Sequence, residues 1–127
     1  MKLAEIYDTA LYLAEKTNDS TGFIDDEYKS LNKMKALELI KQAAVSIANI
    51  ENYSIIDAGR LGYDDELMLP YHLCKFVIPL YVAALLCHHD GEEEKYNLLI
   101  FEYQNALSSV KHNEESVLSY DILEGLR

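Results

Sequence analysis

The sequence predicts an all-α protein, a small bundle of four main helices with a Pro-interrupted buried third helix and an extended C-terminal arm. Three observations predict this fold. Apolar residues recur every three or four positions in several segments, one segment near residues 71–89 is apolar almost throughout, and polar turn residues separate these segments. The 127 residues have the length of one domain, enough to bury a core without disulfides or metal.

The first helix is expected over residues 1–16. Its apolar residues lie at helical spacing and form one stripe, namely Leu3, Ile6, Tyr7, Ala10, Leu11 and Ala14. Residues 17–22 form a polar turn rich in side chains that bond their own backbone. We expect Phe23 and Ile24 to pack the returning chain against the core.

The second helix is expected to begin at Asp25 or Asp26, where a carboxylate can cap free amides, and to end near Asn49 or Ile50. Its predicted buried stripe is Leu31, Met34, Leu37, Ile40, Ala44, Ile47 and Ala48. Residues 51–69 are less regular, with a short extended piece predicted at 53–56. A connection of this length predicts a contact loop.

The third helix follows Pro70, which suits the first turn of a helix because its missing N–H is not needed there. Tyr71–His89 is apolar on nearly every side, and Pro79 inside it predicts a kink or a break. Its continuous apolar stretch is shorter than the ~20 residues of a membrane span, so it predicts a core or interface segment. Three other helices cannot cover it completely, so Phe76, Leu80 and Tyr81 are predicted to be core or subunit-interface residues.

Asp90-Gly91 marks the next turn, either as a glycine cap of the third helix or with Asp90 as the N-cap of the last. The last helix is expected to end near residues 111–113, and its stripe is Tyr96, Leu99, Ile100, Tyr103, Ala106, Leu107 and Val110. We therefore divide the chain into a bundle domain, residues 1–113, and an arm, residues 114–127. The arm is predicted to bind a partner through Val117, Leu118, Tyr120, Ile122, Leu123 and Leu126.

The charge balance narrows the possible partners. The 22 acidic and 11 basic residues give a net charge of −11. A surface that grips nucleic-acid phosphates needs the opposite sign, and so does one that binds anionic membranes. We therefore expect protein partners, no specific nucleic-acid binding and no membrane binding. Acidic residues close to the N-terminus also argue against a signal peptide.

The sequence contains no convincing catalytic or metal-binding motif. Cys74 and Cys87 would lie roughly 20 Å apart along a helix, too far for a disulfide. His88 and His89 are adjacent, so they point about 100° apart on a helix and cannot share one metal ion. We also find no nucleophile elbow, phosphate loop or dinucleotide motif. The sequence predicts no enzyme, no cofactor and no metal.

The order of several short motifs resembles a known family of structural proteins. In chain order these motifs are the polar turn Glu15–Gly22, Tyr28-Lys29, the acidic stretch Asp64–Pro70, the proline-interrupted Ile78–Leu86, the acidic break His89–Glu94, and Phe101-Glu102-Tyr103. Together they resemble the head–tail connector (adaptor) proteins of tailed phages and prophages. The chain departs from that pattern at Cys87-His88-His89, where the family has an acidic turn.

The resemblance implies a helical protomer that forms a homo-oligomeric ring beneath the portal protein, with DNA passing through its channel. It implies that the arm grips the portal, that neighbouring head–tail proteins bind elsewhere, and that the protein is found in the virion and, during assembly, in the host bacterial cytoplasm. The alternative is a small helical bacterial partner-binding or regulatory module that acts as a homodimer.

Overall fold

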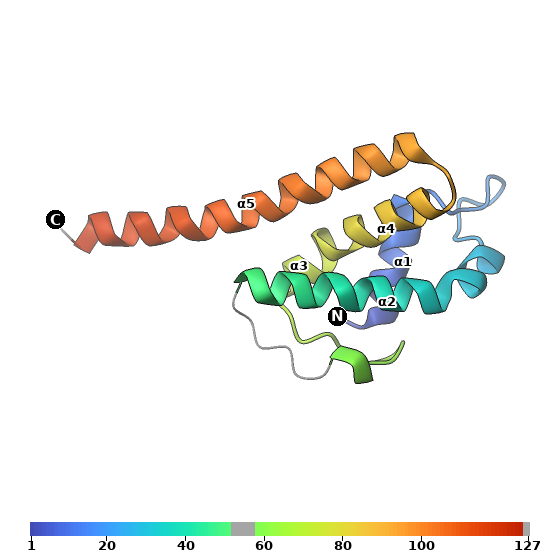
Figure 1. The fold of residues 1–127 in the computed structure, drawn as a ribbon, viewed down its shortest axis with the longest axis horizontal. Coiled ribbons are helices and arrows are strands. Elements are labelled where there is room, and N and C mark those ends of the chain that lie inside the picture. The colour runs from blue at the N-terminus through green and yellow to red at the C-terminus, as the bar shows by residue number, and fades with distance from the viewer. Residues whose placement is uncertain (52–57, 126–127) are drawn as a thin grey trace.

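The fold is all-α, as expected, and its helices pack around one buried apolar helix. The computed structural model describes the backbone of residues 1–51 and 58–125, and the side chains of residues 1–50 and 59–109. Its elements are α1 (Leu3–Leu13), α2 (Asp26–Glu51), a short 3-10 turn η1 (Ala58–Arg60), α3 (Tyr71–Phe76), α4 (Ile78–His89) and α5 (Glu93–Gly125). No strand occurs within these described ranges. Helices α1, α2 and α5 all pack on α4, and α5 runs out past the other helices (Figure 1).

The stripe predicted for the first helix is buried in full. Five of its residues lie in α1, Ala14 directly follows α1, and all six are 0% exposed. Helix α1 is shorter than the predicted 1–16 at both ends. Its first amides are satisfied by the loop before α3, since Leu3 and Ala4 donate to the carbonyls of Asp65 and Tyr63. The acidic loop around Asp65 therefore stabilises the start of α1.

The C-terminal end of α1 comes earlier than predicted because Glu15 takes a left-handed backbone conformation, with φ 58°. The amide of Lys16 then bonds the carbonyl of Leu11 at 2.9 Å, and the amide of Glu15 bonds that of Tyr12 at 3.1 Å. This is the Schellman pattern that closes a helix. The chain turns away there, and Ile24 packs against the core, whereas Phe23 is 71% exposed, so its predicted packing is wrong.

Helix α2 has the predicted boundaries, and Asp25 caps its first turn through bonds from the amides of Glu27 and Tyr28. The buried stripe is correct from Leu37 to Ala48 and wrong at its start. Leu31 and Met34 are 77% and 72% exposed, whereas Leu37 is 7% exposed. The predicted extended piece at 53–56 lies outside the described residues.

The predicted interruption by Pro79 is confirmed as a break between α3 and α4 at Val77. Pro79 occupies the first turn of α4, where a missing N–H is tolerated, and its ring excludes a continuous helix through Lys75. The two pieces together have the length and apolar composition of a membrane span. Most of their apolar side chains, however, are covered by the other helices, as in the core of a bundle.

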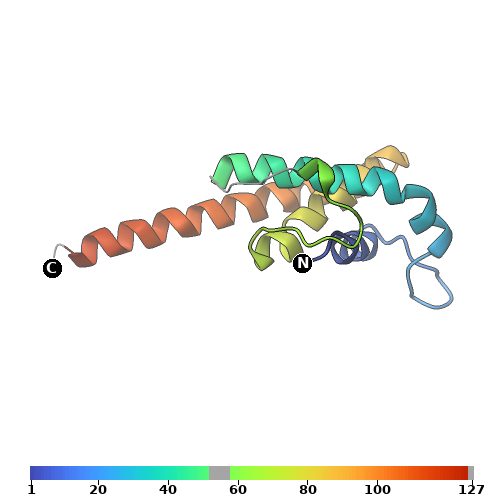
Figure 2. The same ribbon diagram turned by 90° about the horizontal axis from the view of Figure 1, so that it is seen from below.

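At the end of α4 the glycine cap, and not an Asp N-cap, is the correct alternative. Gly91 has φ +78°, and the amide of Glu92 bonds the carbonyl of Cys87 at 2.9 Å. The predicted end of the last helix near residues 111–113 is wrong, because α5 continues to Gly125. Figure 2 shows the same long helix leaving the bundle in a second view.

The two leucines of α2 provide a matched test of this packing. We expect Leu37→Ala to lower the free energy of unfolding by about 2–4 kcal/mol, because it opens a cavity in the core. Leu31→Ala on the same helix should change it by less than about 0.5 kcal/mol. Chemical denaturation of both variants measures the difference, and equal losses would contradict the orientation of α2.

Candidate functional site

A polar cluster joins three parts of the chain at one end of the bundle. The Lys16 ammonium lies 2.9 Å from the Asp90 carboxylate and also pairs with Glu92. The Tyr28 hydroxyl donates to Asp90 at 2.6 Å, and the Lys16 ammonium stands 4.9 Å from the centre of the Tyr28 ring. Lys95 extends the cluster by pairing with Glu92 at 2.9 Å. We call these five residues the polar clamp.

The polar clamp shifts the ionisation of its members. Burial works to raise the pKa of the Asp90 carboxyl, but the hydrogen bonds from Tyr28 and Lys16 outweigh it and hold that pKa below its usual value. The hydrogen bond from Lys16 is the main reason that the pKa of Glu92 is also lowered. Burial, followed by the bond to Asp90, raises the pKa of Tyr28 well above its ordinary value. The clamp is therefore charged at neutral pH and acts as a structural link.

Two residues of the sequence's metal-like cluster, His88 and Cys87, are poorly placed to bind a metal ion. The Nδ1 of His88 lies 2.9 Å from a Glu93 oxygen, and the His88 ring stacks on Tyr96 with centroids 4.7 Å apart. Cys87 is buried, and burial raises the pKa of its thiol, so it is a poor nucleophile. Within the described part of the chain, no group of three or more His, Cys, Asp or Glu side chains is placed to hold a metal ion.

Two apolar surfaces flank α4. The first, which we call the aromatic seam, follows the line where α4 meets α5. Along α4 the half-buried residues are Tyr81 and Leu85, one turn apart, and Tyr81 contacts Tyr103 of α5 with ring centroids 5.4 Å apart. On α5 the residues of this line are partly buried, namely Tyr96, Ile100, Tyr103 and Leu107.

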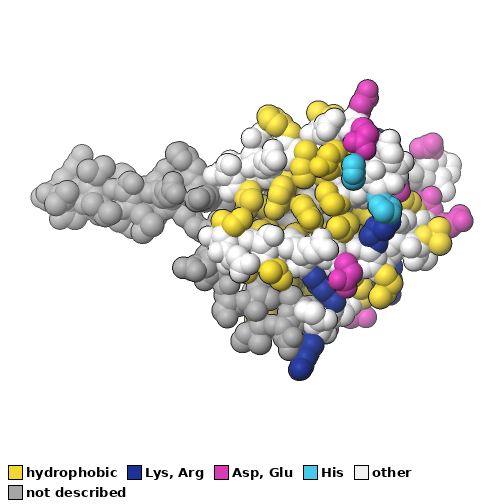
Figure 3. All heavy atoms as spheres, in the orientation of Figure 1, with side chains coloured by type: hydrophobic (Ala, Val, Ile, Leu, Met, Phe, Trp, Pro, Cys, Tyr) yellow, Lys and Arg dark blue, Asp and Glu magenta, His cyan; other side chains and the backbone are white. Residues whose placement is uncertain are grey.

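The aromatic seam is open to the surface because α2 and α5 both pack on α4 and have at most marginal contact with each other in the described chain. Figure 3 shows hydrophobic side chains gathered between α5 and α2 on this face. The predicted interface residue Tyr81 lies here, half-buried, whereas Leu80 is 9% exposed and belongs to the core.

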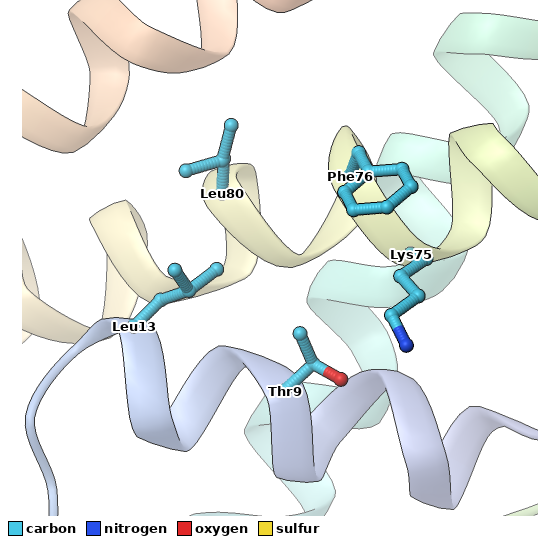
Figure 4. A pocket seen from close by; sticks show the side chains of 5 residues that line it. All are labelled: Thr9, Leu13, Lys75, Phe76 and Leu80. Atoms are coloured by element: carbon cyan, nitrogen blue, oxygen red, sulfur yellow. The ribbon is translucent and has the colours of Figure 1, made fainter.

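The second surface is an apolar hollow on another side of α4, with a volume of about 340 Å³. It is lined by Thr9 and Leu13 of α1 together with Lys75, Phe76 and Leu80. Leu13 and Leu80 lie at one end of the hollow and Lys75 at the other (Figure 4). Phe76, predicted to be in the core or an interface, is 61% exposed at its edge.

Comparison with known proteins does not assign a family. No protein-family model, curated protein or solved structure matches this chain.

Sequence reasoning singled out Phe76, Leu80 and Tyr81, and the structure places Phe76 and Leu80 on the hollow and Tyr81 on the aromatic seam. The sequence analysis did not identify three exposed apolar side chains, those of Leu13, Leu98 and Phe101, which are 39%, 66% and 61% exposed. The signal for the last two was present, because they fall off the predicted stripe of α5. The predicted arm residues from Val117 to Leu126 lie outside the described side chains, so their role stays a prediction.

The polar clamp yields a pH-dependent prediction. Tyr28→Phe removes the hydrogen bond to Asp90 and should lower the free energy of unfolding by about 1 kcal/mol at pH 7. The folded pKa of Asp90 is lowered, so the clamp's contribution is present above the unfolded value of about 4 and is lost as the pH falls below it. The difference between wild type and Y28F should therefore shrink toward pH 3.

Denaturation of both proteins between pH 3 and pH 7 measures this difference. Tyr12→Phe serves as the control, because Tyr12 is half-exposed on α1. A difference between wild type and Y28F that stays constant over the whole range would refute the role of Asp90.

Proposed function

We propose that this chain is a virion structural protein of a phage or prophage, a head–tail connector (adaptor) protomer that docks on the portal ring. The observation that carries the proposal is the shape of α5. This helix has 33 residues, and its described side chains pack on the bundle as far as Leu107. The remainder projects beyond every other helix (Figure 1).

A projecting helix suits a protein that works by reaching a partner. Thirty-three residues of helix, the length of α5, span roughly 50 Å. In the sequence, apolar residues occur at Leu118, Ile122 and Leu126, each four positions after the one before. This four-residue spacing is the sequence pattern of an amphipathic helix, which fits an apolar groove on its partner.

The motifs that resemble connector proteins support the proposal further, because several of them have structural tasks in this fold. Tyr28 and the acidic break around Asp90 meet in the polar clamp. The acidic stretch before α3 supplies the carbonyl of Asp65 to the start of α1. Pro79 sets the break between α3 and α4. These contacts give a physical reason for the motifs to occur together in one chain.

Removal of the arm tests the proposal. A chain truncated after Val110 should keep the folded bundle and lose binding to the portal protein of the same phage. A triple variant, Leu118→Ala with Ile122→Ala and Leu126→Ala, should lose most of the binding while retaining good helix formers. Co-sedimentation with assembled portal rings measures the binding, and circular dichroism checks the fold.

If the truncated chain binds the portal as wild type does, the arm is not the portal-binding segment. Glu27→Lys, an exposed change on α2, is the control and should bind as wild type does.

The alternative, a homodimeric partner-binding module, is favoured by the aromatic seam. This surface is apolar and open, and two copies could cover it by a two-fold contact. The mass of the purified protein distinguishes the two functions. A tight dimer at every concentration, dissociated by Leu85→Glu, would favour the module and count against the connector.

A further inference from the structure

We infer that the apolar hollow beside α1, α3 and α4 binds a small amphiphilic carboxylate, with its carbon chain in the hollow and its carboxylate on the Lys75 ammonium. The site lies wholly among described side chains. It involves neither the arm nor the aromatic seam, so it depends neither on portal docking nor on association between copies.

The hollow has the size of a small-molecule site. Its volume of about 340 Å³ lies at the lower end of the roughly 300–1,000 Å³ that is typical of ligand pockets. Thr9 and Leu13, one turn apart on α1, form one side of it. Phe76 and Leu80 form the other side, one before and one after the break between α3 and α4. The hollow therefore lies at the junction of three helices.

The lining of the hollow suits a saturated carbon chain. Leu13 and Leu80 form one end (Figure 4), and Leu80 is 9% exposed, so the core holds it in place. Phe76 is 61% exposed, so a ligand can cover much of its ring. The hydroxyl of Thr9 already donates to the carbonyl of Glu5 at 2.9 Å and needs no acceptor from a ligand. A carbon chain can thus bury these side chains without leaving that donor unpaired.

Lys75 determines the charge of the ligand. Its side chain is exposed at the other end of the hollow (Figure 4), 5.7 Å from the centre of the Tyr71 ring. It makes no ion pair with a carboxylate of the described residues. Phe76 also lines the hollow beside Lys75, so a carboxylate on the ammonium would rest its first carbon atoms on that ring. A ligand with an anion at one end of a carbon chain fits both side chains at once.

The charge of the whole protein favours a small ligand over an acidic protein segment. The chain has a net charge of −11, so a segment with several carboxylates is repelled by most of its surface. A small carboxylate brings a single negative charge, which Lys75 can neutralise. The combination of one ammonium with an apolar hollow therefore points to a monoanionic amphiphile.

Titration of the full chain with octanoate and with 1-octanol provides the test, because the two share one carbon chain and differ in charge at pH 7. For octanoate, about ten non-hydrogen atoms correspond to a dissociation constant of about 1 mM or lower. We expect 1-octanol to bind about fivefold more weakly, because it cannot pair with the ammonium. NMR spectra of the ¹⁵N-labelled protein measure both affinities, and the amide signals of Thr9, Leu13 and Lys75 should move.

Variants separate the contribution of the charge from that of the apolar lining. Lys75→Met should weaken octanoate binding about fivefold and leave 1-octanol binding unchanged. Leu13→Gln should weaken the binding of both ligands. Lys33→Met is the matched control, because Lys33 also stands near a tyrosine ring, 4.1 Å from the centre of that of Tyr63, but lies on α2. It should bind both ligands as wild type does, and circular dichroism confirms that each variant is folded.

Any of four results would overturn the inference. These are no octanoate binding up to about 10 mM, 1-octanol bound as tightly as octanoate, an unchanged octanoate affinity in K75M, or signal changes confined to the aromatic seam around Tyr81 and Leu85. All measurements use the isolated protein, so their failure is separate from a failure to bind the portal.

Discussion

The fold depends on the need to cover α4, a helix that is apolar on nearly every side. Burying its side chains is the main gain in folding this domain, because each large apolar side chain removed from water contributes about 1.5–3 kcal/mol. No single neighbour can cover such a helix, so α1, α2 and α5 surround it. The break at Val77 turns α3 aside and lets Leu73 and Cys74 join the same core. Three neighbours still leave openings, and the aromatic seam and the hollow are those openings.

Apolar packing alone does not fix where helices lie along their axes, and the polar clamp supplies that restraint at one end of the bundle. Lys16 follows α1, Tyr28 lies in the first turn of α2, and Asp90 closes α4, so one network fixes three helix ends. A second link comes from Tyr7, which is fully buried and donates its hydroxyl to the carbonyl of Lys29 at 2.8 Å. The clamp lies where α5 begins. From this clamped end α5 runs along the bundle and then beyond it (Figure 1).

The sequence predicted the core of this fold better than its edges. The stripe of α1 was predicted in full because its spacings alternate between three and four residues. The stripe of α2 failed at Leu31 and Met34 because they were reached from Leu37 by steps of three, and each such step lags about 60° behind a full turn. The end of α5 was misplaced because polar residues after Lys111 were taken for a boundary. In fact no Gly or Pro interrupts the chain between Glu92 and Gly125, so helix can continue.

The surfaces were harder to predict for a different reason. Leu13 and Phe76 are more than sixty positions apart, and no local pattern indicates that they line one hollow. Exposed apolar residues such as Leu98 can be recognised from the sequence only by their position outside the predicted buried stripe. The apolar composition of residues 71–89 predicted a helix that its neighbours cannot cover completely. The open aromatic seam agrees with that prediction. The composition did not indicate that the uncovered apolar surface would lie on two sides of the helix.

The acidity of the chain gives these openings a particular meaning. A net charge of −11 makes copies repel one another at distances up to the screening length, about 8 Å in physiological salt. Exposed apolar groups on such a protein therefore do not lead to indiscriminate association, because a random encounter brings like charges together. A specific contact must place one of the few cations opposite a carboxylate while apolar side chains are buried. Four of the eight lysines with described side chains pair with carboxylates within the fold, namely Lys16, Lys29, Lys41 and Lys95. Such a combination of general repulsion and local charge pairing favours ordered association over aggregation.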